Sequence, residues 1–150
     1  MTNLVVAQTT QQNGDWDDPD TWGGAVPATN ANIVIAHNVD VDATASCNSI
    51  TINDGARLDV EASFTVATTS TNSGNLYLLT GDMVLTAGDF TNNGDIIISS
   101  GTDFVFSDAG TTLTNTGTIS INSSASSFGS LLLSGTYSES GSGKVEYSRY

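Results

Sequence analysis

Basic residues are scarce in this chain of 150 residues: three face 16 acidic residues, which gives a formal charge of −13. That charge repels the phosphate backbone of nucleic acids and the surface of anionic membranes, so we expect no nucleic-acid partner. Long apolar runs are also missing, and no segment approaches the roughly 18 apolar residues of a membrane helix. The sequence therefore indicates neither nucleic-acid binding nor membrane insertion.

Cysteine and histidine occur once each, as Cys47 and His37. One cysteine forms no intrachain disulfide, and one histidine with one cysteine makes no zinc set. No Gly-x-Ser-x-Gly elbow is present, so a nucleophilic triad is not indicated. Acidic residues are plentiful enough for a glycosidase pair, but no pair is distinguished by its surroundings. We expect a protein that is not an enzyme.

Good helix formers are few, and Gly, Asn, Thr and Ser interrupt the chain every few residues. Short runs of alternating apolar residues occur instead, which is typical of β-strands. They fall into three classes that recur in one order with a period of about 23 residues. The first class is Ile50/Ile52, Leu76/Leu78, Ile96/Ile98, Ile119/Ile121 and Val145/Tyr147. The second is Leu58/Val60, Met83/Leu85, Phe104/Phe106 and Leu131/Leu133; the third is Phe64, Phe90, Leu113 and Tyr137.

This repeat predicts an all-β fold: a right-handed parallel β-solenoid, or β-helix, with three short strands per coil and about five coils. An antiparallel sandwich also contains many short strands. It does not require one cyclic order of three strand types, so the solenoid is favoured.

An Asn-x-Gly motif precedes several strands of the first class. Its asparagines should stack at one corner of the coils and form a hydrogen-bonded ladder, and we expect its glycines to supply a positive φ. The residues concerned are Asn72, Asn92 and Asn115, with Gly74, Gly94 and Gly117.

Outward positions of the strands carry apolar side chains that do not belong on a free surface. We predict an interaction face made of Val84, Val105, Leu132, Tyr77 and Ile97. An exposed apolar patch of this kind indicates a protein partner or self-association, or else a covering N-terminal segment.

Acidic residues cluster at two places. Arg57, Asp82 and Asp103 each precede a strand of the second class, so a salt bridge is expected there, with Ca²⁺ as the alternative. Asp15, Asp17, Asp18 and Asp20 lie close together but lack the EF-hand pattern. These six aspartates are weak metal candidates, and we expect no cofactor.

The N-terminal region differs from the repeats, because Trp16, Trp22 and Pro27 lie in it together with four aspartates. We divide the chain into an arm and cap at residues 1–32 and a solenoid at residues 33–150, within a single domain. A solenoid needs a cap over its open end, and the two tryptophans are large enough to fill it. Stacking of sugars on these tryptophans is the alternative.

A resemblance supports the fold. The segments "TWGGAVP" and "NIVIAHNVDVDATASCNSITINDGARLDV", within residues 16–60, resemble the eight-glycine domain family and related bacterial and phage surface modules. The resemblance implies a β-solenoid. Relatives in this group include adhesins, cell-surface proteins and hyaluronan-handling enzymes, so it implies no single activity.

The start of the chain shows no signal peptide, and the chain reads as a complete product. We therefore expect a structural protein of a virion surface: a capsid decoration protein, a head fibre or a tail-associated protein. The alternative is an extracellular adhesin or glycan-binding module, and the third reading is a fragment of a glycan-active enzyme.

Overall fold

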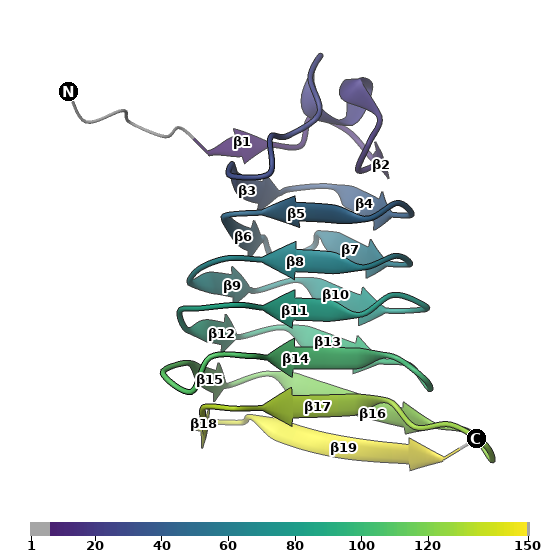
Figure 1. The fold of residues 1–150 in the computed structure, drawn as a ribbon, viewed down its shortest axis with the longest axis vertical. Coiled ribbons are helices and arrows are strands. Elements are labelled where there is room, and N and C mark those ends of the chain that lie inside the picture. The colour runs from purple at the N-terminus through teal and green to yellow at the C-terminus, as the bar shows by residue number, and fades with distance from the viewer. Residues whose placement is uncertain (1–6, 150) are drawn as a thin grey trace.

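A computed structural model describes residues 7–149 of the chain, and Figure 1 shows its fold. The described residues form a parallel β-solenoid of about six coils, in which three sheets surround one core. One short 3-10 helix, η1 (Pro19–Trp22), precedes the regular coils. The predicted fold class is confirmed, with about one coil more than expected. Within the described residues, no helix has the length and apolar character needed to span a membrane.

Each strand within a sheet pairs in parallel with the equivalent strands of the coils above and below it, and the outermost strands pair on one side only. Sheet A contains β1 (Gln8–Thr9), β3 (Asn32–Ile35), β6 (Ser49–Ile52), β9 (Ser70–Asn72), β12 (Phe90–Asn92), β15 (Thr112–Asn115) and β18 (Thr136–Glu139). Sheet B contains β2 (Gly14–Asp15), β4 (Asn38–Val41), β7 (Arg57–Val60), β10 (Asn75–Leu78), β13 (Asp95–Ile98), β16 (Thr118–Ser123) and β19 (Lys144–Arg149). Sheet C contains β5 (Ala45–Cys47), β8 (Phe64–Val66), β11 (Met83–Leu85), β14 (Asp103–Phe106) and β17 (Ser130–Leu133).

The coils wind with a right hand. In Figure 1 the strands of sheet C run from right to left at the front, and those of sheet B run from left to right behind them, while the chain descends. This is the hand that parallel crossover connections adopt.

The core is a stack of alternating side chains, because the side chains of a strand point in turn to its two faces. In β10, for example, Leu76 and Leu78 are fully buried, whereas Tyr77 between them faces outward. Phe90, Phe104 and Phe106 pack together in the lower coils, with centroid separations of 4.6 to 6.1 Å. The short apolar runs of the sequence are therefore the inner walls of the coils.

The predicted strand classes are right from β10 onward and wrong before it. Leu76 pairs with Leu58 rather than following Ile50/Ile52, and Met83 pairs with Phe64. The cause is β9, whose inward residues Ser70 and Asn72 are polar and so give no apolar signal. When β9 is overlooked, each earlier strand is assigned to the neighbouring sheet, and one coil is lost.

The asparagine ladder is present at the corner between sheets A and B. Asn72 Nδ2 donates to Asn92 Oδ1 at 2.8 Å, and Asn92 Nδ2 donates to Asn115 Oδ1 at 2.8 Å. All three side chains are fully buried. Below them, Asn115 Nδ2 lies 3.3 Å from the hydroxyl of Tyr137. The ladder joins successive coils inside the core and fixes their vertical register, and Asn72 Oδ1 at its upper end is left without a hydrogen-bond partner among the described residues.

The glycines beside this ladder serve a purpose other than the one expected. Gly74, Gly94 and Gly117 are not among the glycines with positive φ. A Cβ on Gly94 would instead collide with the carbonyl oxygen of Gly74, and one on Gly117 with that of Gly94. Glycine is required here because the backbones of successive coils approach too closely for any side chain.

The N-terminal region closes the top of the solenoid. Its strands β1 and β2 extend sheets A and B by two residues each, pairing with β3 and β4. Trp16 packs at 5.0 Å against Trp22 and at 5.0 Å against Phe64, and Trp22 Nε1 donates to the carbonyl of Trp16 at 2.7 Å. Pro27 is buried as well. These residues form the cap; residues 1–6 of the expected arm lie outside the described residues.

Candidate interaction surface

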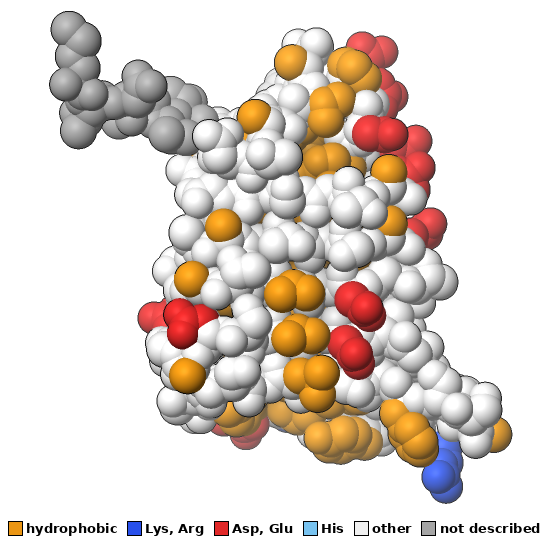
Figure 2. Space-filling view, in the orientation of Figure 1, with side chains coloured by type: hydrophobic (Ala, Val, Ile, Leu, Met, Phe, Trp, Pro, Cys, Tyr) orange, Lys and Arg blue, Asp and Glu red, His pale blue; other side chains and the backbone are white. Residues whose placement is uncertain are grey.

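An apolar column runs down the outer face of sheet C. Val84 of β11 pairs directly with Val105 of β14, and Val105 pairs with Leu132 of β17. The two valines are half-buried, and Leu132 is 48% exposed. In Figure 2 hydrophobic side chains form a vertical row over these strands, with acidic side chains beside it. We call Val84, Val105 and Leu132 the sheet C stripe.

Tyr77 and Ile97 do not belong to this stripe. They pair with each other on the outer face of sheet B, which points in another direction. The five apolar residues predicted to form one interaction face are therefore divided between two sheets. The sequence correctly identified outward positions, but the angle between the sheets separates them.

Above Tyr77, the outer face of sheet B is acidic. Asp15, Asp40 and Asp59 are stacked in register on β2, β4 and β7. Burial, together with the neighbouring carboxylates of Asp59, Glu61 and Asp15, raises the pKa of Asp40. Like charges in one column disfavour one another, so a nearby cation is needed to offset them.

Arg57 is that cation. Its Nε lies 2.6 Å from Asp59 Oδ1, and its guanidinium lies 4.5 Å from the centre of the Tyr77 ring. The hydrogen bond to Asp59 raises the pKa of Arg57. The expected salt bridge of Arg57 with Asp82 or Asp103 is wrong, because Arg57 begins a strand of sheet B, whereas those aspartates adjoin sheet C.

The carboxylate of Asp82 is held by the backbone. The amide of Asp103 donates to Asp82 Oδ1 at 2.8 Å, which gives that carboxylate a neutral partner. Asp18 similarly caps η1, accepting from the amide of Asp20 at 2.9 Å. These aspartates stabilise turns and a helix end.

One group of carboxylates has spacing suited to a metal. Ligand atoms of Asp15, Asp17 and Asp42 all lie within 4.8 Å of one another, and all three residues are exposed. The sequence identified Asp15 and Asp17 but not Asp42, which follows β4 one coil below. Only the stacking of coils brings it close, so the predicted grouping with Asp18 and Asp20 was incomplete. Exposed acidic groups of this kind are common without an ion.

The tryptophans of the cap offer little surface for a sugar ring. Trp16 and Trp22 are each 5% exposed; their rings contact each other edge to face, and Trp16 also contacts Phe64 in this way. Beside them lies an open hollow of about 370 Å³, which Val26, Pro27 and the edge strand β5 help to line. Trp16 itself is one of the residues that line this hollow.

His37 and Cys47 occupy structural positions. His37 Nδ1 lies 3.1 Å from Thr10 Oγ1, which also accepts from the amide of Ala36. Cys47 is buried in the core, and burial raises the pKa of its thiol to about 12. A thiol with that pKa is not a nucleophile at neutral pH.

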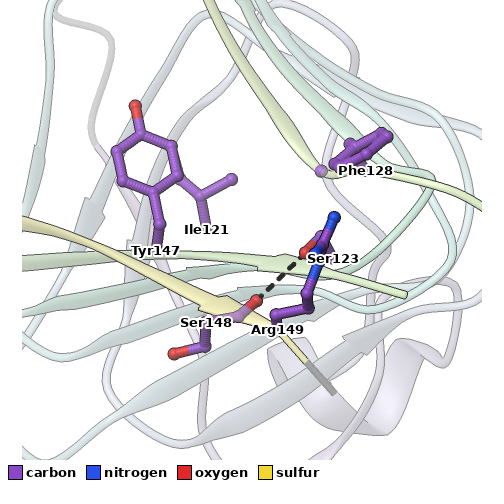
Figure 3. Close-up of a pocket in the computed structure, with 7 residues that line it drawn as sticks. Ile121, Ser123, Phe128, Tyr147, Ser148 and Arg149 are labelled. Atoms are coloured by element: carbon purple, nitrogen blue, oxygen red, sulfur yellow. Dashed lines mark hydrogen bonds between the residues drawn. The ribbon is translucent and has the colours of Figure 1, made fainter. Parts of the chain in front are cut away.

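The last coil carries a second apolar surface that the sequence did not indicate. Phe128 is 63% exposed and Tyr147 is 81% exposed. Figure 3 shows these two rings on either side of a hollow of about 300 Å³, with Ile121 at its base. Tyr147 occupies an inward position of β19, since it pairs with Ile121. The sequence pattern predicts that such a residue is buried; the structure leaves it exposed because no described coil follows.

A comparison with protein-family models, with curated proteins and with solved structures found no match for this chain. The resemblance to the eight-glycine domain family therefore stays a prediction from residues 16–60.

Proposed function

We propose that this chain is a non-enzymatic structural protein that attaches a rigid β-solenoid to the surface of a larger assembly. We further propose that the assembly is a phage virion, in which the chain is a capsid decoration, head fibre or tail-associated component. The sheet C stripe is the observation that carries this proposal. It is a continuous row of apolar side chains on three neighbouring strands of one sheet, in a chain with a formal charge of −13.

The stripe is suited to docking because its backbone is rigid. Val84, Val105 and Leu132 lie on central or last strands of one sheet, about 4.8 Å apart along the coil axis. A partner that covers them removes apolar surface from water at about 25 cal/mol per Å² and orders little flexible chain. The neighbouring Asp82 and Asp103 would favour a partner with basic residues beside an apolar ridge.

A secreted adhesin or glycan-binding module has weaker support. Its recognition was expected to rest on Trp16 and Trp22, and both rings are used inside the cap. Sugar stacking requires an open aromatic face, which neither ring offers.

The proposal is tested on phage particles produced by the host that encodes the chain. We expect density-gradient bands to contain the chain in a fixed ratio to the major capsid protein. The variant Val105→Lys should be lost from the particles, whereas Thr114→Lys should remain. Thr114 is the matched control, because it also faces outward from a central strand but lies on sheet A.

Two results would contradict the proposal. One is a chain that stays in the soluble fraction while the particles assemble normally. The other is glycan binding on an array that is lost in Trp16→Ala while Trp16→Phe retains it; that result would favour the glycan-binding module.

A further inference from the structure

The lower end of the solenoid is open. β17, β18 and β19 are the outermost strands of sheets C, A and B, so one edge of each has no neighbour among the described residues. Four of their inward side chains pack on the coil above, and together with Tyr147 they line a hollow at this end: Leu131, Leu133, Tyr137 and Val145. Exposed strand edges next to apolar core are a template for association.

The upper end of the solenoid is different. There the two-residue strands β1 and β2 leave short edges, and the core is covered by Trp16 and Trp22. In Figure 1 the segment between β2 and β3 rises above the first coil. A second copy that approached head to tail would meet this cap rather than a flat coil. The surface of another copy that matches the open end is its own open end.

Electrostatics favour the same contact. Residues 130–149 hold two acids, Glu139 and Glu146, and two bases, Lys144 and Arg149, so this stretch is neutral while the whole chain carries −13. Lys144 Nζ pairs with Glu146 Oε1 at 2.7 Å. Two acidic rods repel each other along most of their length, and this repulsion is smallest at the neutral end.

We propose that two copies of this chain join through their last coils, end to end, across a two-fold axis. Such an axis, perpendicular to the coil axis, reverses strand direction, so strands of the two copies would pair antiparallel. An axis at Tyr147, near the middle of β19, sets this six-residue strand against itself with the two Tyr147 residues opposite each other, and it sets β17 against β18 of the other copy. β17 and β18 have four residues each, so β17 of one copy matches β18 of the other copy in length.

The contact would bury the most exposed aromatic rings of the chain's lower end. Phe128 lies on the turn after β16, where its carbonyl accepts from the amide of Gly101 at 3.0 Å. Tyr147 projects from β19 on the other side of the hollow from Phe128, as Figure 3 shows. Both rings are large enough to act as anchors of an interface, and the hollow between them accepts an apolar group from the second copy.

The mass of the chain in solution tests the proposal. Sedimentation equilibrium of the full chain should give twice 15.5 kDa. Tyr147→Lys should shift the mass to that of one copy, because two lysines would then face each other in the contact. The ring of Tyr147 is 81% exposed, so this change leaves the folded single copy intact. Val26→Lys is the matched control, since Val26 is an exposed apolar residue of the opposite end, and it should stay dimeric.

Cross-linking gives an independent readout. The native Cys47 is buried, with a pKa of about 12, so it does not react at neutral pH. Ser148→Cys places a thiol on β19, and a short bismaleimide should link two copies in high yield. Ala25→Cys places one in the cap, and it should give no linked product.

A wild-type mass of one copy at high concentration, with no linked Ser148→Cys product, would overturn the proposal and assign the open end to a different partner. A mass that grows beyond two copies would replace the two-fold contact with open-ended stacking. Linkage through Ala25→Cys would place the contact at the cap. None of these results bears on attachment through the sheet C stripe, so this inference and the proposed function fail separately.

Discussion

Replacing Asn92 with alanine should destabilise the solenoid more than any change at an exposed asparagine. The Asn92 amide is fully buried in the middle of the ladder. Its Oδ1 accepts from Asn72, and its Nδ2 lies 2.8 Å from Asn115 Oδ1, 3.1 Å from the carbonyl of Gly94 and 3.3 Å from that of Thr118. Alanine removes all of these contacts and leaves their partners inside the core.

The magnitude follows from the groups left without partners. Asn115 Oδ1 loses its donor, and Asn72 Nδ2 keeps only the carbonyl of Asp95 at 3.1 Å. A buried polar group without a partner, here Asn115 Oδ1, costs about 1–3 kcal/mol, and the hydrogen bond lost by Asn72 Nδ2, worth about 1 kcal/mol, together with a small cavity brings the total to about 3–5 kcal/mol. Urea unfolding followed by far-UV circular dichroism measures this loss. Asn93→Ala is the matched control: Asn93 is exposed and accepts only from Thr116 Oγ1, so its loss should be within about 1 kcal/mol.

A double-mutant cycle sharpens the test. Combining Asn92→Ala with Asn115→Ala removes both the donor and the orphaned acceptor, so the double variant should lose less than the sum of the single losses. Strict additivity, or a loss below about 1 kcal/mol for Asn92→Ala alone, would show that the ladder does not stabilise the coils.

Three further changes follow from single positions. Gly94→Ala should cost about 3 kcal/mol in urea unfolding, because its Cβ meets the Gly74 carbonyl, whereas Gly110→Ala, with its nearest atom 3.6 Å away, should be neutral or slightly stabilising. Equal effects of the two changes would refute the close-approach explanation. Asp40→Asn should raise the melting temperature at pH 7. The pKa of Asp40 is raised in the folded state, so its ionised carboxylate lowers the stability of the wild type at pH 7. As pH falls through that pKa the carboxyl binds a proton and the wild type regains the lost stability, so the advantage of Asn should vanish in acid. A benefit that persists in acid would contradict this. Thr21→Val should leave the melting temperature unchanged or higher, since the buried Thr21 Oγ1 has no hydrogen-bond partner among the described residues; a large decrease would reveal a partner.

The sequence was sufficient to predict the architecture, because a solenoid repeats one local pattern. Alternation within each strand gives the inward residues, and the order of the strand classes gives the coil. From β10 onward, the predicted inward pairs are the observed ones, such as Ile96/Ile98 above Ile119/Ile121. The prediction is wrong at β9, where the inward Ser70 and Asn72 are polar. Strands are predicted from alternating apolar residues. A strand whose inward residues are polar and hydrogen-bonded shows no such alternation, so the sequence does not predict it.

The candidate surfaces were only partly predictable, because they depend on residues about 20 or more positions apart. Outward positions such as Val84 and Val105 could be identified from alternation alone. The separation of Tyr77 and Ile97 from them depends on the angle between sheets. The approach of Asp42 to Asp15 and Asp17 depends on which coil lies beside which. The pair of Arg57 and Asp59, by contrast, joins residues two apart on β7, where alternation places both on the outer face.

By itself, the sequence determined the repeat, the inward wall of each later coil and the column of asparagines, since each is written in local spacing. The tertiary structure alone decided why Gly94 must lack a side chain and why the ring of Tyr147 is exposed. Both depend on the distance to a neighbouring coil. In the first case that coil is too close for a Cβ, and in the second no described coil covers the ring.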